Sequence, residues 1–252
     1  SEVSVQLLGG VDPDWRGRGV GRRVLDWQRT RAAQNVADLR AAAAADLPAR
    51  IGSGVEEQVT SHTRLLERAG FTATRWFTEL RRPLTGPYEV PPLDVDGLRV
   101  EPYIDAHAER LRVAHNEAFL DHWGSNPHDA ESWRTNLLED EAFRPQQSFV
   151  IVDRTASGEP VAAYVVNTEY EQDWAAQGFT AGYTEMLGVV RAWRGRGLAR
   201  QLLARSARVF ADAGHPYATL DVDAENPTGA VALYASLGYE AVHRSVYYSV
   251  TA

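Results

Sequence analysis

The segment Arg194-Gly-Arg-Gly-Leu-Ala199 combines the residue types of this sequence that are best suited to binding chemistry. It stands where a strand-like apolar run ends and a helical pattern begins, so its first N–H groups are unpaired and carry partial positive charge. Gly195 and Gly197 let a phosphate approach the main chain closely, and Arg194 and Arg196 add full charges. The segment therefore predicts a cradle for a diphosphate. It is neither the loop of nucleoside triphosphatases, which needs a Lys, nor the dinucleotide loop with three spaced glycines.

The cradle segment occurs twice. An earlier copy, Arg16-Gly-Arg-Gly-Val-Gly21, precedes it at a constant offset of 194 − 16 = 178 residues. Downstream, Leu65–Phe71 matches Leu233–Tyr239 at the shorter offset of 238 − 70 = 168 residues. Such self-similarity indicates two copies of one fold in tandem. We expect an amino-terminal domain over 1–84, a Pro- and Gly-rich linker over 85–97 and a carboxy-terminal domain over 98–252.

Hydrophobic periodicity predicts the elements that must position the second cradle. Apolar runs rich in Val, Ile, Tyr and Phe predict strands, and apolar residues at helical spacing predict helices. The expected strands cover 98–103, 148–153, 160–167, 183–190, 217–222 and 241–250, and the expected helices cover 106–120, 198–213 and 228–237. The fold class is therefore mixed α/β, with the cradle opening a helix directly after a strand.

The first copy is much shorter at its beginning. Only 15 residues precede Arg16, whereas 96 residues of the second copy precede Arg194, a difference of 96 − 15 = 81. A half-sheet without its first strands would leave an open edge and an uncovered face, which stable proteins rarely tolerate. We expect that the sequence begins inside a domain.

Composition excludes several classes of protein. The chain of 252 residues has 26 basic and 34 acidic side chains, and its net charge of −8 argues against nucleic acid as the main partner. Cys is absent, which excludes disulfide frameworks and thiolate metal sites and makes a cytoplasmic location the expectation. No apolar run approaches the roughly 18 residues of a membrane span, so we expect no membrane partner.

Taken together, the motifs of the second copy resemble the GNAT superfamily of N-acetyltransferases. The shared pattern is a strand, the Arg-x-x-Gly-x-Gly/Ala turn and a helix, followed by Asn226, Ala230, Leu233-Tyr234 and Gly238-Tyr239. The resemblance covers essentially the whole of that fold. It implies a central mixed sheet, flanked by helices and splayed between the two parallel strands 183–190 and 217–222.

The resemblance also implies which residues bind the acyl donor, acetyl-coenzyme A. The cradle would hold its diphosphate, and the pantetheine arm would pair with free main chain of the strand before it, as an added strand. The expected cofactor-binding residues are Leu187, Gly188, Val189, Arg194, Gly195, Arg196, Gly197, Leu198, Ala199, Asn226 and Tyr234. GNAT chemistry needs no metal, and we expect none.

In the superfamily an amine attacks the thioester directly in a ternary complex, so a proton acceptor and a proton donor are needed. Tyr234 matches the family's phenol near the coenzyme sulfur and is the expected general acid. Glu185 is the expected base, directly or through water, because strand alternation places it on one face with Leu187 and Val189. Many relatives carry this Glu two residues earlier, where Tyr183 stands. The implied acceptor is a primary amine of a small molecule, and the acidic chain suits a cationic one such as an aminoglycoside or amino sugar.

The first copy keeps a cradle without the acid and the base. At the two offsets Leu7 stands for Glu185, and Leu66 stands for Tyr234. We therefore expect catalysis in the second copy, and either a second coenzyme site or a purely structural role in the first. This arrangement is similar to the tandem GNAT proteins of the mycothiol synthase type, as is the segment Arg81-Arg-Pro-Leu84. The residues of the possible second site are Arg16, Gly17, Arg18, Gly19, Val20 and Gly21.

Structural roles remain alternatives for several of these residues. Tyr234 also suits a buried helix position, Glu185 a charge at the rim of a sheet, and Asn226 a helix N-cap. Two further groups invite a functional interpretation beside a structural one. They are the acidic residues Asp221, Asp223 and Glu225, as metal ligands, and the aromatic residues His115, His122, Trp123 and His128, as acceptor contacts.

Two other functions remain open beside the small-molecule acetyltransferase. A non-catalytic acyl-coenzyme A binding or scaffold protein would keep a cradle and need neither Glu185 nor Tyr234. A protein N-acetyltransferase would need an open groove for a peptide.

Overall fold

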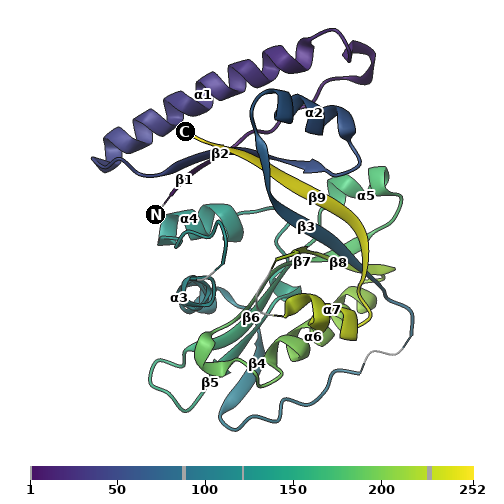
Figure 1. Cartoon of the computed structure of the whole chain (residues 1–252). Helices are drawn as coiled ribbons and strands as arrows, with labels where there is room; N and C mark the ends of the chain where they lie inside the picture. The colour runs from purple at the N-terminus through teal and green to yellow at the C-terminus, as the bar shows by residue number, and fades with distance from the viewer. Residues whose placement is uncertain (1, 87–88, 121, 226–228) are drawn as a thin grey trace. The chain divides into compact units, whose positions relative to one another are not determined.

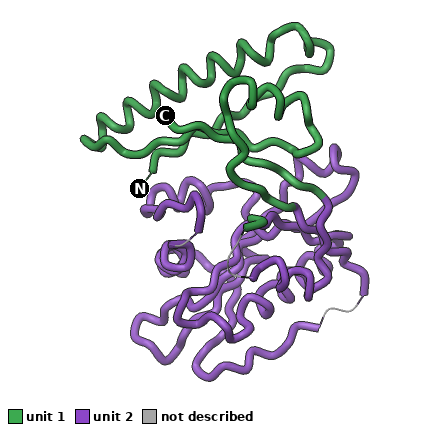
Figure 2. Tube along the Cα trace, viewed as in Figure 1, with its two compact units in different colours: residues 1–78, 223–225, 243–252 green, residues 79–222, 226–242 purple. Residues whose placement is uncertain are grey.

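Two compact units make up the computed structural model of the chain, which describes residues 2–86, 89–120, 122–225 and 229–252. Unit 1 comprises 1–78, 223–225 and 243–252, and unit 2 comprises 79–222 and 226–242 (Figure 2). The first copy of the sequence repeat therefore supplies most of unit 1, and the second copy supplies most of unit 2.

The sheet of unit 2 has the strand order β8-β7-β6-β5-β4. Neighbouring strands are antiparallel from β4 to β7, whereas β7 and β8 are parallel. All eight residues of β6 are buried, as expected for a strand covered on both faces. The strands, labelled in Figure 1, are β4 (Leu98–Pro102), β5 (Phe149–Asp153), β6 (Val161–Thr168), β7 (Ala181–Val189) and β8 (Tyr217–Asp223).

Helices α3 and α6 cover opposite faces of this sheet. Leu111 of α3 belongs to one core cluster with Tyr164 of β6, and Leu202 of α6 belongs to another with Val165 of the same strand. Because successive side chains of a strand point to opposite faces, β6 is packed between the two helices. The helices of unit 2 include α3 (Ala108–Ala118), α4 (Ala130–Trp133), α5 (Glu171–Gln177), α6 (Leu198–Asp212) and α7 (Ala230–Ser236).

Unit 1 is built around β1, β2 and the carboxy-terminal part of β9. β1 and β2 are parallel, and β2 is antiparallel to β9. Its core joins Leu25 of α1, Leu66 of α2 and Val246 of β9. The elements are β1 (Val3–Gln6), α1 (Val20–Ala43), β2 (Ala49–Glu56), α2 (Thr60–Arg68), β3 (Thr72–Pro83) and β9 (Glu240–Thr251).

The parallel strand pairs of the two copies share one register. Val3 lies opposite Ala49 in the first copy, and Ala181 lies opposite Tyr217 in the second. These pairs are related by 181 − 3 = 178 and 217 − 49 = 168, the two offsets of the sequence repeat. Strand pairing thus supports the repeat independently of the cradle motif.

The change of offset from 178 to 168 arises in the helix after the cradle. Helices α1 and α6 begin at the equivalent residues Val20 and Leu198, but α1 has 24 residues and α6 has 15. The extra residues of the first copy therefore lie in the longer α1 and the loop that follows it. The Ala-rich run 41–45, a sequence with high helix propensity, spans the end of α1.

The last strands of the two copies are distributed across the units. β3 and β9 are equivalent, since each has 12 residues and they begin at an offset of 240 − 72 = 168. The carboxy-terminal part of β9 belongs to unit 1, where it pairs with β2. The end of β3 belongs to unit 2, where Leu80 packs in a cluster with Phe210 of α6. Each unit thus includes a piece of the other copy's last strand.

The structure confirms the mixed α/β class, and each strand and helix expected in the second copy is present with small shifts at its ends. The sequence did not predict the short helices α4 and α5. The domain limits 1–84, 85–97 and 98–252 describe the sequence repeat and remain a proposal, because the compact units divide both β3 and β9. Of the helices within the described residues, none is long and apolar enough to cross a membrane.

Candidate active site

Strands β7 and β8 diverge along their length. They pair in parallel over three residues of each strand, Ala181–Tyr183 and Tyr217–Thr219. Beyond Tyr183, β7 keeps its pairing with β6, whereas no further pair with β8 is formed among the described residues. The expected splay is therefore present. It leaves main-chain groups of β7 open along one edge, where an extended ligand arm can pair with them.

A β-bulge places Glu185 at this opening. Val166 of β6 lies opposite Met186, whereas the next residue, Asn167, lies opposite Thr184. Glu185 is therefore the extra residue between two paired positions. Bulges redirect side chains, and this one projects a carboxyl group where the two parallel strands separate.

A buried polar network fixes the register next to the bulge. The Asn167 side-chain amide donates to the Ser206 hydroxyl at 2.9 Å and to the main-chain oxygen of Gln147 at 2.6 Å. The Thr184 hydroxyl donates to Asn167 Oδ1 at 3.2 Å. These three side chains are buried, so losing one bond would leave an unpaired polar group in the core. The network therefore determines which residue of β7 is the extra, unpaired residue of the bulge.

The bulge changes the alternation expected from the sequence, and that expectation was wrong for Glu185. Leu187 and Val189 pack against the cluster of α6, whereas Met186 packs against the cluster of α3. Glu185 does not share the face of Leu187 and Val189. Its hydrogen-bond partner is Tyr170, whose ring also contacts that of Tyr183. The extra residue shifts the strand's period by one, which places Glu185 on the face opposite α6.

The carboxyl group of Glu185 is held by a tyrosine. The Tyr170 hydroxyl donates to Glu185 Oε2 at 2.8 Å. Although the Glu185 side chain is exposed, the protein atoms around it displace water, and this desolvation raises the pKa of Glu185 above its ordinary value. The hydrogen bond from Tyr170 opposes that rise, and the charges of Asp140 and Asp221 add to it. A raised pKa makes the carboxylate a stronger proton acceptor.

Tyr183 holds a second carboxyl group. Its hydroxyl donates to Asp221 Oδ2 at 3.1 Å, and its ring meets that of Tyr170 edge to face with centroids 5.5 Å apart. Desolvation raises the pKa of both phenols, so both stay protonated and act as donors. Tyr170, Tyr183, Glu185 and Asp221 are called the tyrosine–carboxylate cluster below.

Tyr234 lies on the other side of the sheet from Glu185. It is 8% exposed and belongs to the core cluster of α6, β8 and α7, against which Leu187 also packs. Desolvation raises the pKa of Tyr234 to about 12, so the phenol is protonated at neutral pH. The candidate acid and the candidate base thus lie on opposite faces of the sheet that contains β7.

The second cradle has a backbone conformation that suits the binding of an anion. Gly195 and Gly197 have φ angles of +77° and +75°, a region that favours glycine. A Cβ built on either meets no atom of the described part of the chain within 4 Å. Among the described residues, no side chain caps the N-terminus of α6 at Gly197. Open space beside uncapped N–H groups and a positive helix end fits an anion.

The two arginines of this cradle bond to main-chain oxygens. Arg194 donates to Val189 at 3.1 Å and to Ala118 at 3.0 Å, and Arg196 donates to Ala192 at 3.4 Å. These bonds tie the loop to the end of β7 and to α3. Asn226, the remaining expected binding residue, lies outside the described residues.

The first cradle has nearly the same geometry. Gly17 and Gly19 have φ angles of +75° and +79°, and a Cβ on either also meets open space. Arg16 donates to Val11 at 3.1 Å, as Arg194 does to Val189. In addition, Arg18 lies 5.2 Å from the ring centroid of Trp15. The first copy has therefore kept the conformation of the loop and not only its letters.

The acidic residues considered as metal ligands are held by other partners. Arg75 forms ion pairs with Asp223 and Glu225, each at 2.7 Å. Asp221 belongs instead to the tyrosine–carboxylate cluster. Within the described part of the chain, no group of three or more His, Asp or Glu side chains is arranged to hold a metal ion.

The histidine region is largely part of the core. His115 is 5% exposed, shares a hydrogen bond of 2.7 Å with the Tyr164 hydroxyl and stacks on Phe119 at 4.5 Å. Desolvation lowers the pKa of His115 to about 4. The ring is thus a neutral, satisfied core residue. His122 and His128 contact Phe119 and Trp133 edge to face.

Tyr170 was missed by the sequence analysis, and Asp221 was considered only as a metal ligand. Tyr170 precedes the short α5, and Asp221 lies in β8, far from Glu185 in the sequence. The one signal available was the alternation in 217–223, which directs Asp221 away from the face of Leu220 and Val222. The contact of Tyr170 with Glu185 depends on the bulge between β6 and β7, and that of Asp221 with Tyr183 depends on the pairing of β7 with β8.

The splayed α/β sheet and the Gly-rich turn that opens a helix after one diverging strand are the features that the resemblance to the GNAT acyltransferases implies. Comparison with known proteins agrees. Residues 108–239 match the model of the acetyltransferase (GNAT) family. A mycothiol acetyltransferase from Thermobifida fusca is 32% identical in an alignment 255 residues long. The alignment covers 94% of this chain and 72% of that protein.

Two solved structures share the fold. A GCN5-related N-acetyltransferase from Sphaerobacter thermophilus aligns with a TM-score of 0.76 at 24% identity, over 99% of this chain and 73% of that one. A tandem GNAT protein from the clavulanic acid biosynthesis pathway aligns with a TM-score of 0.70 at 16% identity, over 98% and 75% of the two chains. This chain belongs to the acetyltransferase (GNAT) family, and the protein is an acetyltransferase.

Proposed function

We propose that the protein transfers an acetyl group from acetyl-coenzyme A to a primary amine of a small molecule, and that unit 2 performs the reaction. The observation that carries this proposal is the position of Glu185. It is the extra residue of a bulge, at the opening between β7 and β8, on the strand whose end leads into the second cradle.

The proposed binding residues follow the open edge of β7. Main-chain groups of Leu187, Gly188 and Val189 would pair with the pantetheine arm, and N–H groups over 195–199 would hold the diphosphate. Arg194 orients the loop through its bond to Val189. Bound there, acetyl-coenzyme A supplies an activated thioester carbonyl. Asn226 and Tyr234 complete the set on the basis of the family pattern.

Two proton transfers accompany the proposed exchange of bonds. The amine nitrogen forms a C–N bond to the acetyl carbonyl carbon, and the C–S bond of the thioester breaks. Glu185 accepts the proton that the amine loses, directly or through water. Tyr234, on the other face of the sheet, donates a proton to the departing thiolate through the opening beyond Tyr183, where β7 and β8 form no further pair among the described residues. The raised pKa of the Glu185 carboxyl and the protonated state of the buried Tyr234 phenol support these roles.

Tyr170 is proposed as a positioning residue. Its hydrogen bond to Oε2 fixes one oxygen of Glu185 and leaves the other free to accept a proton. The bond also stabilises the ionised carboxylate, which keeps the raised pKa of Glu185 from climbing further.

The acceptor is proposed to be cationic in its resting form. The tyrosine–carboxylate cluster contains two carboxyl groups, those of Glu185 and Asp221. The chain as a whole has a net charge of −8. Both features favour an ammonium group. The mycothiol acetyltransferase similar to this chain is named for a small thiol, so the deacetylated form of mycothiol is the first acceptor to try, with glucosamine as an amino-sugar comparison.

The first cradle is proposed to bind a second coenzyme A without catalysis. Its glycine conformations and the Arg16 hydrogen bond match those of the second cradle. Leu7 and Leu66 occupy the positions of the base and the acid. This site would bind the coenzyme but leave its thioester unchanged.

Calorimetric titration with acetyl-coenzyme A tests the assignment of the two cradles. Gly197→Glu adds a carboxylate to the second cradle, and Gly197→Ala is its control, because both strain the same positive φ but only one repels a diphosphate. Gly19→Glu and Gly19→Ala serve the first cradle. We expect each Glu variant to lose one binding site and only Gly197→Glu to lose turnover.

A non-catalytic scaffold is the alternative that this experiment addresses. Coenzyme binding to the wild type without acetylation of any amine would favour it over the enzyme. Loss of turnover in Gly19→Glu but not in Gly197→Glu would contradict the assignment of catalysis to unit 2.

A further inference from the structure

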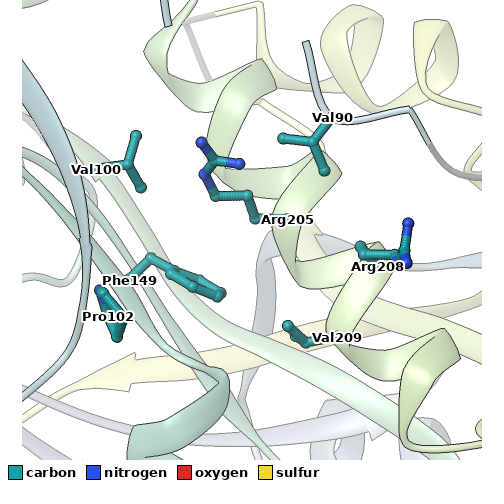
Figure 3. A pocket seen from close by; sticks show the side chains of 7 residues that line it. All are labelled: Val90, Val100, Pro102, Phe149, Arg205, Arg208 and Val209. Atoms are coloured by element: carbon teal, nitrogen blue, oxygen red, sulfur yellow. The ribbon is translucent and has the colours of Figure 1, made fainter. Parts of the chain in front are cut away.

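Unit 2 contains a pocket that shares no lining residue with the tyrosine–carboxylate cluster or the cradle. Its volume is about 280 Å³, and it lies between α6, strands β4 and β5, and the segment that precedes β4. Figure 3 shows the side chains that surround it. They are Val90, Val100, Pro102, Phe149, Arg205, Arg208 and Val209.

The walls of this pocket are mostly apolar. Val100 and Pro102 lie on β4, Phe149 begins β5, and Val209 belongs to α6 (Figure 3). None of these side chains can satisfy a charged group. The polarity of the pocket therefore comes from its two arginines.

The two arginines differ in their partners. Arg208 donates to both carboxylate oxygens of Asp212, one turn along α6, at 2.9 and 3.0 Å. Arg205 forms neither a hydrogen bond nor an ion pair with any of the described residues, although it is partly buried. In Figure 3 its guanidinium extends from α6 toward the side of Val100.

Leaving a guanidinium partly desolvated and unpaired costs free energy. The same desolvation lowers the pKa of Arg205 from its ordinary value. A bound carboxylate would relieve this cost, because it matches the planar guanidinium with two parallel hydrogen bonds. A multiply charged phosphate suits the pocket less well, since apolar walls would surround it and only one cation is free to pair.

We propose that this pocket binds a small organic carboxylate with an apolar body, whose carboxylate pairs with Arg205 while its body packs on Phe149 and Val209. The proposal concerns a site separate from acetyl transfer and does not depend on the proposed function. The volume accommodates a short acyl chain or a single aromatic ring.

Titration of hexanoate into the full chain, followed by calorimetry, tests the proposal. We expect saturable binding with a dissociation constant of about 1 mM, reasonable for so few atoms in an open pocket. Arg205→Met keeps the length of the side chain and removes its charge, and it should weaken hexanoate at least roughly tenfold. Arg99→Met is the matched control, because Arg99 neighbours Val100 on β4 but points to the other face. It should bind like the wild type.

Thermal unfolding provides an independent readout of the same variants. Since Arg205 has no hydrogen-bond or ion-pair partner among the described residues, Arg205→Met should not lower the unfolding temperature in the absence of ligand. Hexanoate should raise the unfolding temperature of the wild type and of Arg99→Met, but not that of Arg205→Met. Hexylammonium, which has the same chain and the opposite charge, should have no effect.

Three outcomes would overturn the proposal. They are the absence of saturable hexanoate binding to the wild type, equal binding by wild type and Arg205→Met, and equal binding of hexanoate and hexylammonium. The second would mean that the apolar walls alone bind the alkyl group of hexanoate. The third would mean that the charge of the ligand plays no part.

Discussion

Glu185 and Tyr234 occupy environments suited to opposite proton tasks. The Glu185 side chain is exposed, yet the surrounding protein atoms desolvate its carboxyl group. Its raised pKa therefore favours proton uptake. Tyr234 is 8% exposed, and the same physical cause raises its pKa to about 12, which keeps its proton available for a leaving group. Desolvation disfavours the charged form of both groups, and their chemistry makes one a base and the other an acid.

Replacing Glu185 by Gln should lower kcat/KM by about 100-fold or more, because general base catalysis is typically worth that much. The loss should appear in steady-state rates with acetyl-coenzyme A and the deacetylated form of mycothiol. Glu67→Gln is a matched control, since Glu67 also accepts a tyrosine hydroxyl, that of Tyr248 at 3.1 Å, but in unit 1. An equal loss in both variants would remove the case for Glu185 as the base.

Tyr170→Phe should move the acidic limb of the kcat/KM profile to higher pH. The bond from Tyr170 stabilises ionised Glu185, so its removal raises the pKa of a base that must be deprotonated to act. One hydrogen bond corresponds to roughly half to one pH unit. A pH series on Tyr170→Phe checks this, and Tyr248→Phe should leave the limb in place. A limb that stays, or moves to lower pH, would contradict the role given to Tyr170.

At the scale of elements, β7 has two features that position the site. Its parallel pairing with β8 ends at Tyr183, and its bulge against β6 frees Glu185. The Asn167 network fixes that bulge from the core. Glycines matter where another side chain fills their space: a Cβ at Gly182 would lie 2.1 Å from Phe210, and one at Gly188 would lie 2.4 Å from Tyr164.

The sequence predicted the strands and the three longer helices of the second copy and the position of both cradle segments, because hydrophobic periodicity and glycine spacing are local properties. It predicted Glu185 but assigned its side chain to the wrong face, since the bulge depends on how β6 and β7 pair. Tyr170 bonds to Glu185, and Asp221 accepts from Tyr183, only once β6, β7 and β8 are paired in the folded sheet. The sequence also could not predict how β3 and β9 are divided between the two units, because these equivalent strands have similar sequence patterns and could pair in either unit.

Glycines in β2 allow a test of its packing against β9 in unit 1. A Cβ at Gly52 would lie 2.3 Å from the Tyr247 ring, whereas one at Gly54, on the same strand, meets nothing within 4 Å. Gly52→Ala should therefore destabilise the protein by about 1–3 kcal/mol through overpacking, and Gly54→Ala should change stability little. Urea unfolding of both variants measures the difference. Equal stabilities would mean that Tyr247 does not occupy this space.

At the scale of the whole molecule, the compact units do not coincide with the two copies of the repeat. β9 belongs to the second copy by sequence, yet its carboxy-terminal part pairs with β2 of unit 1 over seven residue pairs. The first copy therefore completes its sheet with residues from the other end of the chain. A cut at the sequence boundary 85–97 would separate β2 from this partner.

Val246→Ala should loosen unit 1, although Val246 lies in the second copy. The side chain is 4% exposed and packs with Leu25 and Leu66. Its truncation should cost about 2 kcal/mol. Hydrogen exchange should show faster opening of amides in β2 and unchanged opening in β5 of unit 2. Unchanged protection in β2, or equal loss in both strands, would contradict this division of the chain.

Transfer of labelled acetyl from acetyl-coenzyme A to the deacetylated form of mycothiol tests the central claim most directly. The product would be followed by mass spectrometry in the wild type, Glu185→Gln and Glu67→Gln. We predict acetylation on the amine nitrogen by the wild type and by Glu67→Gln, with at least roughly 100-fold slower formation by Glu185→Gln. Wild-type rates in Glu185→Gln, or a wild type that binds the coenzyme but acetylates neither this amine nor glucosamine, would contradict the account.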